Sequence, residues 1–159
     1  MRENDVVSVL ANRYASAAMR EVFSPEAKII AERKLWIAVA RAQSGLGHAI
    51  DAKVIADYEK VVEKVDLKSI DEREKKNRHD VKARIEEFNA LAGHEAIHAG
   101  MTSRDLTENI EALQILRGLE IVQAKTITVL ARMAERASEY SALATVSYTH
   151  LTLPTKRIV

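Results

Sequence analysis

Hydroxyl side chains stand at the start of a long helical pattern in residues 100–109, where they could bind an anion. Gly100 supplies a turn, Thr102 or Ser103 can cap the helix, and Asp105 lies close to the spacing of a capping box. Hydroxyl groups and free backbone N–H groups at a helix start form an anion site. By itself, however, the segment is more simply explained as a well-capped helix.

A basic and an acidic residue flank a histidine in the sequence Arg78-His79-Asp80. We expect Asp80 to cap a helix that continues to Gly93, which places Arg78 and His79 at the positive end of that helix. A neutral imidazole or a bound anion is favoured at that position. A histidine beside a helix cap is also common on ordinary polar surfaces, so the motif alone does not define a site.

Arg13 and Tyr14 are adjacent and offer a guanidinium group and a phenol, which together suit a phosphate or a carboxylate. A surface arginine beside a half-buried tyrosine explains the same two residues equally simply. His94 and His98 lie four residues apart, a spacing that can bind a metal on a helix. Because no third ligand is evident, we expect neither a metal nor another cofactor.

The composition indicates an all-α protein, because aromatic residues make up only 4% of 159 residues and there are two prolines and five glycines. The formal net charge of +1 gives no reason to expect nucleic acid or an anionic membrane as a partner. No apolar run reaches the length of a membrane span. The absence of cysteine excludes disulfides and thiolate metal sites, and it fits the cytoplasmic location that we expect.

Helix signals divide most of the chain into consecutive helices. Ser24-Pro25-Glu26 starts one that Gly45 and Gly47 end, with Trp36 expected in the core. Further helices are predicted at about 52–64 and 67–76. The longest is predicted from Thr102 to about Tyr140. It carries an apolar seam that implies partner helices, made of Ile115, Leu119, Val122, Thr126, Val129 and Met133.

Residues 146–155 break the helical pattern, because they are rich in β-branched residues and carry no Asp, Glu, Lys or Arg. They also resemble one reading frame of a transposon adapter used in sequencing libraries. We therefore expect residues 146–159 to be a non-native tail and the chain to be incomplete. The alternative is a genuine strand-like tail.

Three motifs in this order resemble the N-terminal portion of the adenylosuccinate lyase family, within the fumarase/aspartase superfamily. They are Asn12-Arg13-Tyr14-Ala15-Ser16, Arg78-His79-Asp80-Val81-Lys82-Ala83 and His98-Ala99-Gly100-Met101-Thr102-Ser103-Arg104-Asp105. The resemblance implies an N-terminal helical domain at 1–101 and, at 102–145, the first long helix of a central bundle. It also implies a cytoplasmic homotetramer that acts in purine biosynthesis.

The implied reaction is the elimination of fumarate from adenylosuccinate, giving AMP, and from the succinylated carboxamide ribotide. Arg13 and Tyr14 match the pair that holds substrate phosphate, and Thr102 and Ser103 match the pair that holds the succinyl part. Arg78, His79 and Asp80 match the motif that carries one of two active-site histidines. His150, in Thr149-His150, matches the general acid, but it falls within the suspected tail.

The resemblance also leaves a part of the active site unaccounted for. The family's catalytic serine lies on a Gly-Ser-Ser loop that has no counterpart in this sequence, and its active sites combine three subunits. We therefore expect this chain to be inactive alone. Two alternatives stay open: a non-enzymatic helical interaction module, and another lyase of the superfamily such as argininosuccinate lyase.

Overall fold

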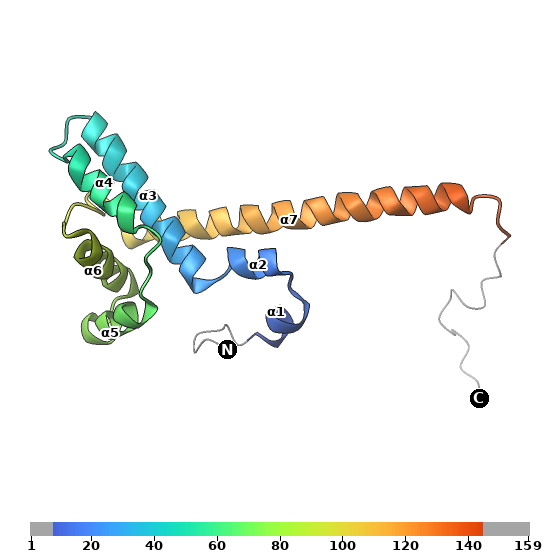
Figure 1. Ribbon diagram of the computed structural model, residues 1–159, viewed down its shortest axis with the longest axis horizontal. Helices are drawn as coiled ribbons and strands as arrows, with labels where there is room; N and C mark the ends of the chain where they lie inside the picture. Colours follow the sequence, from blue (N-terminus) through green and yellow to red (C-terminus); the bar gives the residue numbers. More distant parts are fainter. Residues whose placement is uncertain (1–7, 145–159) are drawn as a thin grey trace. The chain divides into compact units, whose positions relative to one another are not determined.

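The computed structural model describes residues 8–144, which form helices joined by short connections (Figure 1). The part of the chain that it describes contains no strand, which confirms the all-α prediction. The helices are α1 (Val9–Tyr14), α2 (Ala17–Val22), α3 (Pro25–Gly45), α4 (Ala52–Val61), α5 (Leu67–Asn77), α6 (Asp80–Ala92) and α7 (Ser103–Glu139).

The start of α3 confirms what its sequence predicted. The Ser24 side-chain oxygen accepts a hydrogen bond from the Ala27 N–H at 3.1 Å, and Pro25 occupies the first turn, where its missing N–H removes no helical hydrogen bond. After α3 ends, Gly47 adopts a φ of 92°, a left-handed conformation that glycine tolerates at little cost.

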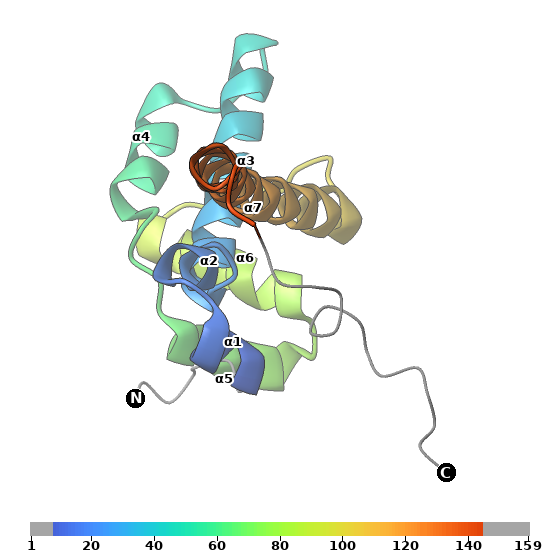
Figure 2. The ribbon, with the colours of Figure 1, turned by 90° about the vertical axis from the view of Figure 1, so that its right-hand side faces the viewer.

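The core forms where α3, α4, α6 and the first turns of α7 meet. Packing of α4 against both α3 and α6, and of α5 against α6, brings their apolar faces together (Figures 1 and 2). As predicted, Trp36 is in the core, and its ring stacks on Phe88 with centroids 6.2 Å apart. The main core cluster comprises Trp36, Ile37, Ala40, Ile55, Tyr58, Val81, Phe88 and Leu106.

A buried ion pair crosses this core. Arg33 of α3 is fully buried and pairs with Glu87 of α6, and it also donates to the Val61 and Val62 carbonyls at 3.0 Å each. Its guanidinium lies 4.6 Å from the centroid of the Phe88 ring. The hydrogen bonds and the opposite charge offset part of the cost of removing Arg33 from water, while its buried Nε has no hydrogen-bond partner among the described residues.

The first turns of α7 bury one face of that helix against the N-terminal helices. Leu106, Ile110, Gln114 and Gly118 recur every fourth residue and are buried. The Gln114 side chain donates to the Val22 carbonyl at 2.8 Å. A Cβ atom at Gly118 would lie 3.2 Å from the ring of Phe23, so glycine allows this close approach.

The chain divides into two compact units between Ile121 and Val122, within α7. In the second unit every residue from 122 to 144 is exposed. The residues of the predicted apolar seam that lie in this unit, Val122, Thr126, Val129 and Met133, therefore have no cover within the described chain. None of the helices described, α7 included, is long and apolar enough to cross a membrane.

Candidate functional site

The connection between α6 and α7 carries the third sequence motif in a chain of tight turns. Gly93 ends α6 in a left-handed conformation, and its N–H donates to the Asn89 carbonyl. His98 and Gly100 also have positive φ values, of 65° and 71°. The Met101 N–H donates to the His98 carbonyl at 3.3 Å, which closes a turn with Gly100 at the position that requires a positive φ.

Side chains from the core fix this connection from one side. The buried Tyr58 hydroxyl accepts the Ala96 N–H at 3.1 Å and lies 2.8 Å from the His94 carbonyl, to which it can donate. Burial raises the pKa of Tyr58, so the hydroxyl keeps its proton. From α3, the Gln43 side chain donates to the Ala99 carbonyl at 2.9 Å.

Trp36 makes a further contact with this connection from the core. Its indole Nε1–H donates to the Nδ1 atom of His98 at 3.0 Å, across 62 positions of sequence. The His98 ring meets the Trp36 ring edge-on, with centroids 6.0 Å apart and an interplanar angle of 86°. The connection is therefore held by the hydrophobic core as well as by its own turns.

The start of α6 corrects one prediction. His79, and not Asp80, caps this helix, because the His79 Nδ1 atom accepts the Lys82 N–H at 3.3 Å while Asp80 is the first helical residue. Imidazole nitrogen can accept in the same way as the carboxylate oxygen that the sequence favoured. An Nδ1 atom that accepts requires the proton of a neutral His79 to lie on Nε2.

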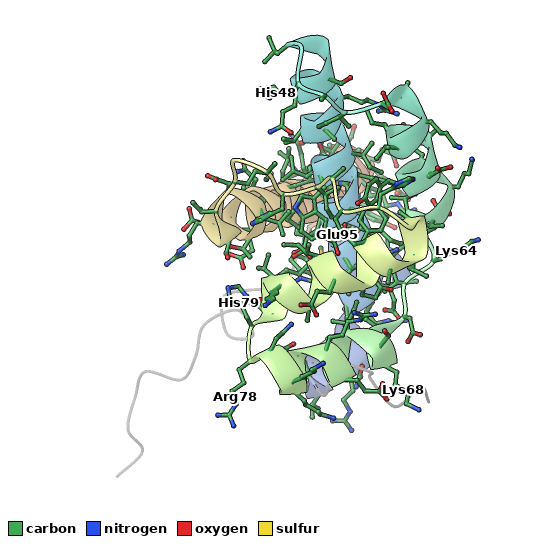
Figure 3. All side chains as sticks on the ribbon, turned by 90° about the vertical axis from the view of Figure 1, so that its left-hand side faces the viewer. His48, Lys64, Lys68, Arg78, His79 and Glu95 are labelled. Carbon is green, nitrogen blue, oxygen red and sulfur yellow. The ribbon has the colours of Figure 1, made fainter. Side chains whose placement is uncertain are left out.

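The neighbours of His79 have different environments. Arg78 ends α5 with a φ of 54° and is exposed, and Figure 3 shows its side chain pointing away from α6. Asp80 pairs with Arg84 at 2.9 Å. Partial burial opposes the change, but the hydrogen bond from the Val81 N–H and the charge of Arg84 lower the pKa of Asp80 overall, so it is ionised at neutral pH.

The start of α7 shows one of the two contacts of the predicted capping box. Ser103 is the first helical residue, and the Asp105 carboxylate accepts the Thr102 N–H at 2.7 Å. Thr102 is exposed and Ser103 is half-buried, so both lie where a ligand can reach the helix end. The carboxylate of Asp105 already occupies one of the backbone donors of this helix end.

His98 links the starts of α6 and α7 electrostatically. Burial lowers the pKa of His98; the negative charge of Asp105 partly opposes this, and the positive charge of His79 adds to it. His79 and Asp105 are thus both near enough to His98 to affect its pKa. The sequence analysis considered His98 only as half of a metal pair and Asp105 only as part of a helix cap, although both lie in the third motif.

Arg13 and Tyr14 lie elsewhere. Both are exposed on α1, a helix with no buried residue, and Tyr14 is 76% exposed. In Figures 1 and 2, α1 lies beside α2 and apart from the start of α7. Within this chain the structure does not bring the first motif to the other two. His150 lies outside the described residues.

The histidines of the connection are engaged separately. His94 Nε2 lies 3.0 Å from the Asp57 carboxylate, whereas His98 accepts from Trp36. No group of three or more histidine, cysteine, aspartate or glutamate side chains that could hold a metal occurs in the part of the chain that is described.

Known proteins match nearly the whole chain. It is 34% identical to an adenylosuccinate lyase of Schistosoma mansoni in an alignment of 145 residues that covers 89% of this chain and 30% of that protein. An adenylosuccinate lyase of Saccharomyces cerevisiae is also 34% identical, over 89% of this chain and 30% of its own length. The chain is a homologue of the adenylosuccinate lyases. No protein-family profile matches it.

The homologue spans about 30% of the length of these curated relatives. Its helical architecture is consistent with the fumarase/aspartase fold that the resemblance implied. A further relative, an N-acetyl-S-(2-succino)cysteine lyase of Enterococcus italicus, is 28% identical over 89% of this chain and 32% of that protein. The names of these matched lyases all refer to a compound that carries a succinyl group.

Proposed function

We propose that this chain forms part of an adenylosuccinate lyase, which eliminates fumarate from adenylosuccinate and from the succinylated carboxamide ribotide. The observation that carries the proposal is the match of this chain to adenylosuccinate lyases at 34% identity over 89% of its length, with imidazole and hydroxyl side chains at the starts of α6 and α7. The names of the relatives refer to succinylated compounds, and a succinyl group carries two carboxylates. Helix starts with hydroxyl and imidazole donors suit carboxylates.

The reaction needs three kinds of group. A base removes the proton beside a carboxylate, donors stabilise the charge that develops there, and an acid protonates the departing amine. We assign the donors to Thr102 and Ser103 and one active-site imidazole to His79, whose Nε2 carries the proton when the ring is neutral. His150 stays the proposed acid.

We assign the phosphate of the substrate to Arg13 and Tyr14, and supporting contacts to Arg78 and Asp80. Because α1 lies apart from the starts of α6 and α7 in this chain, these assignments require that another copy supply the first motif. A homotetramer, located in the cytoplasm, is the proposed assembly of the whole enzyme. We expect the chain alone to release no fumarate.

A segment exchange tests this function. Residues 8–144 would replace the matching segment of the yeast relative, and fumarate release from adenylosuccinate would be followed by absorbance. We expect an active chimera whose turnover falls at least about 100-fold on His79→Ala, as for loss of an acid–base group. Lys68→Ala, at an exposed position on α5, serves as the control. A chimera that folds and assembles but releases no fumarate contradicts the proposal.

The exposed face of α7 favours a second candidate, a helical interaction module without catalysis. Val129, Leu130 and Met133 are each more than half exposed, so this helix presents apolar surface for a partner. This candidate predicts a defined oligomer or complex and a chimera in which His79→Ala changes nothing. The fumarate assay separates the two, because both candidates predict an oligomer but only the lyase loses turnover on His79→Ala.

A further inference from the structure

The hydrogen bond between Trp36 and His98 determines which nitrogen of the imidazole can carry a proton. An indole N–H can only donate, and it points at His98 Nδ1 from 3.0 Å. Nδ1 must therefore present its lone pair. The proton of a neutral His98 then has to be on Nε2, the nitrogen on the other side of the ring.

The indole is not free to follow the imidazole. Trp36 is 1% exposed, and Phe88 packs against it at an interplanar angle of 26°. Both rings belong to the main core cluster, whose side chains interlock at the density of an organic crystal. Any rotation of the indole would displace core side chains, so the core fixes the direction of the N–H.

The backbone of His98 is held in an uncommon conformation. Its φ of 65° is unfavourable for a residue with a Cβ atom. The turn hydrogen bond from Met101 and the Gln43 contact with Ala99 maintain it. Such conformations persist where the surrounding structure determines them, and they concentrate at functional sites.

The surroundings of the ring also favour its neutral form. Burial lowers the pKa of His98, and the charge of His79 adds to this while that of Asp105 opposes it. A neutral imidazole whose Nδ1 is occupied has one polar function left, the Nε2–H donor. Thr102 and Ser103 follow His98 within five residues at the proposed carboxylate-binding helix start.

We propose that Trp36 is a positioning residue that holds His98 as the Nε2–H tautomer, so that His98 donates a hydrogen bond to a carboxylate of the succinyl group. The choice of tautomer follows from the core contact, whereas the identity of the ligand rests on the proposed function. Trp36 does not touch the substrate in this proposal and acts only through His98.

The first test is a side-chain nitrogen NMR spectrum of the 159-residue chain, with His98 assigned from its loss in His98→Gln. We expect Nδ1 of His98 to be unprotonated and Nε2 protonated above the pKa. Trp36→Phe keeps a ring but removes the donor, so it should give a mixture of tautomers and a raised pKa for His98. Phe88→Leu disturbs the packing but keeps the donor, so it should preserve the tautomer.

Three results would overturn the assignment. They are a wild-type His98 protonated on Nδ1, a Trp36→Phe variant that keeps the pure Nε2–H form, and a Phe88→Leu variant that loses it as completely as Trp36→Phe does. His94, whose ring bonds to Asp57 and not to Trp36, serves as the internal control and should not respond. If Trp36→Phe unfolds the chain, Trp36 replaced by β-(3-benzothienyl)alanine keeps the bicyclic shape but has sulfur in place of the N–H, and it should give the same mixture of tautomers; a pure Nε2–H form in that variant would overturn the assignment.

The ligand is tested separately with succinate as the probe. Succinate should shift the Nε2–H resonance of His98, and Trp36→Phe should weaken its binding by about twofold to tenfold, the range for one hydrogen bond. If succinate binds without shifting this resonance, the donor role is wrong. If succinate does not bind at all, the proposed function loses its support, while the tautomer is still decided by the first test.

Discussion

Replacing Glu87 by glutamine should destabilise the fold strongly, because it leaves the charge of Arg33 buried without a counter-ion. The two side chains are 2% and 0% exposed. Breaking such a pair costs about 3–5 kcal/mol, whereas a whole domain is stable by about 5–15 kcal/mol. Glu87 also accepts the Asp66 N–H at 3.2 Å. If the new glutamine side chain turns its NH₂ group toward Asp66, this hydrogen bond is lost as well and the free energy of unfolding falls further.

The chain offers a matched control for this measurement. Arg41 and Glu59 form a similar arginine–glutamate pair between α3 and α4, but their side chains are 60% and 40% exposed. Glu59→Gln should therefore cost less than about 1 kcal/mol. Urea denaturation followed by circular dichroism gives both free energies, provided that the slope with urea is the same in each variant.

A double variant tests the reason for the expected loss. The double variant Arg33→Met/Glu87→Met removes both charges. Its loss in free energy of unfolding should be smaller, by at least about 2 kcal/mol, than the sum of the losses of Arg33→Met alone and Glu87→Met alone. Some loss remains because the Val61 and Val62 carbonyls lose their donor. Additive single costs, or a Glu87→Gln variant as stable as Glu59→Gln, would refute the reasoning.

Four further predictions concern single residues. Burial raises the pKa of Glu32 above the ordinary 4.5 against the charges of nearby cations, so the free energy of unfolding should decline as pH rises through this raised value. Glu32→Gln should remove that decline in urea titrations between pH 4 and 8. Gly93 has a φ of 75° and open space around it, so Gly93→Ala should cost about 1–2 kcal/mol in the same assay. Gly45, with open space and no positive φ, should instead gain up to about 1 kcal/mol on replacement by alanine. The hydrogen bond from Lys60 lowers the pKa of Asp57 to about 2, so the stability that Asp57 contributes should be lost as pH falls from 3.8 through about 2. Lys60→Met should raise this pKa in a carboxylate NMR titration.

Capping residues, prolines and glycines in the sequence predicted the helices well, because neighbouring residues determine where a helix starts and ends. Ser24 and Pro25 start α3 as expected, and the predicted long helix corresponds to α7. The cap of α6 was wrong by one residue, since carboxylates are commoner caps than imidazoles but His79 can also accept. Whether His79 or Asp80 caps α6 depends on the path of the backbone as it enters the helix.

Helical periodicity could not predict the contacts between residues that lie far apart in the sequence. The sequence predicted Trp36 in the core, but it could not show that Trp36 contacts His98 or that Arg33 of the same helix pairs with Glu87. These pairs are separated by 54 and 62 positions. The candidate site was found from its motifs, whereas its positioning contacts required the structure.

Helix α3 contributes residues to the core and also makes hydrogen bonds to the connection that contains the candidate site. Trp36 and Gln43 reach His98 and Ala99 from it, two helical turns apart, and Arg33 joins it to α6. The connection that contains His98 and Thr102 is thus fixed by buried side chains outside the helices that flank it. Its geometry depends on the packing of α3, α4 and α6, whereas residues 122–144 are all exposed. Positioning of the candidate site and the presentation of apolar surface on α7 are therefore separable properties of this chain.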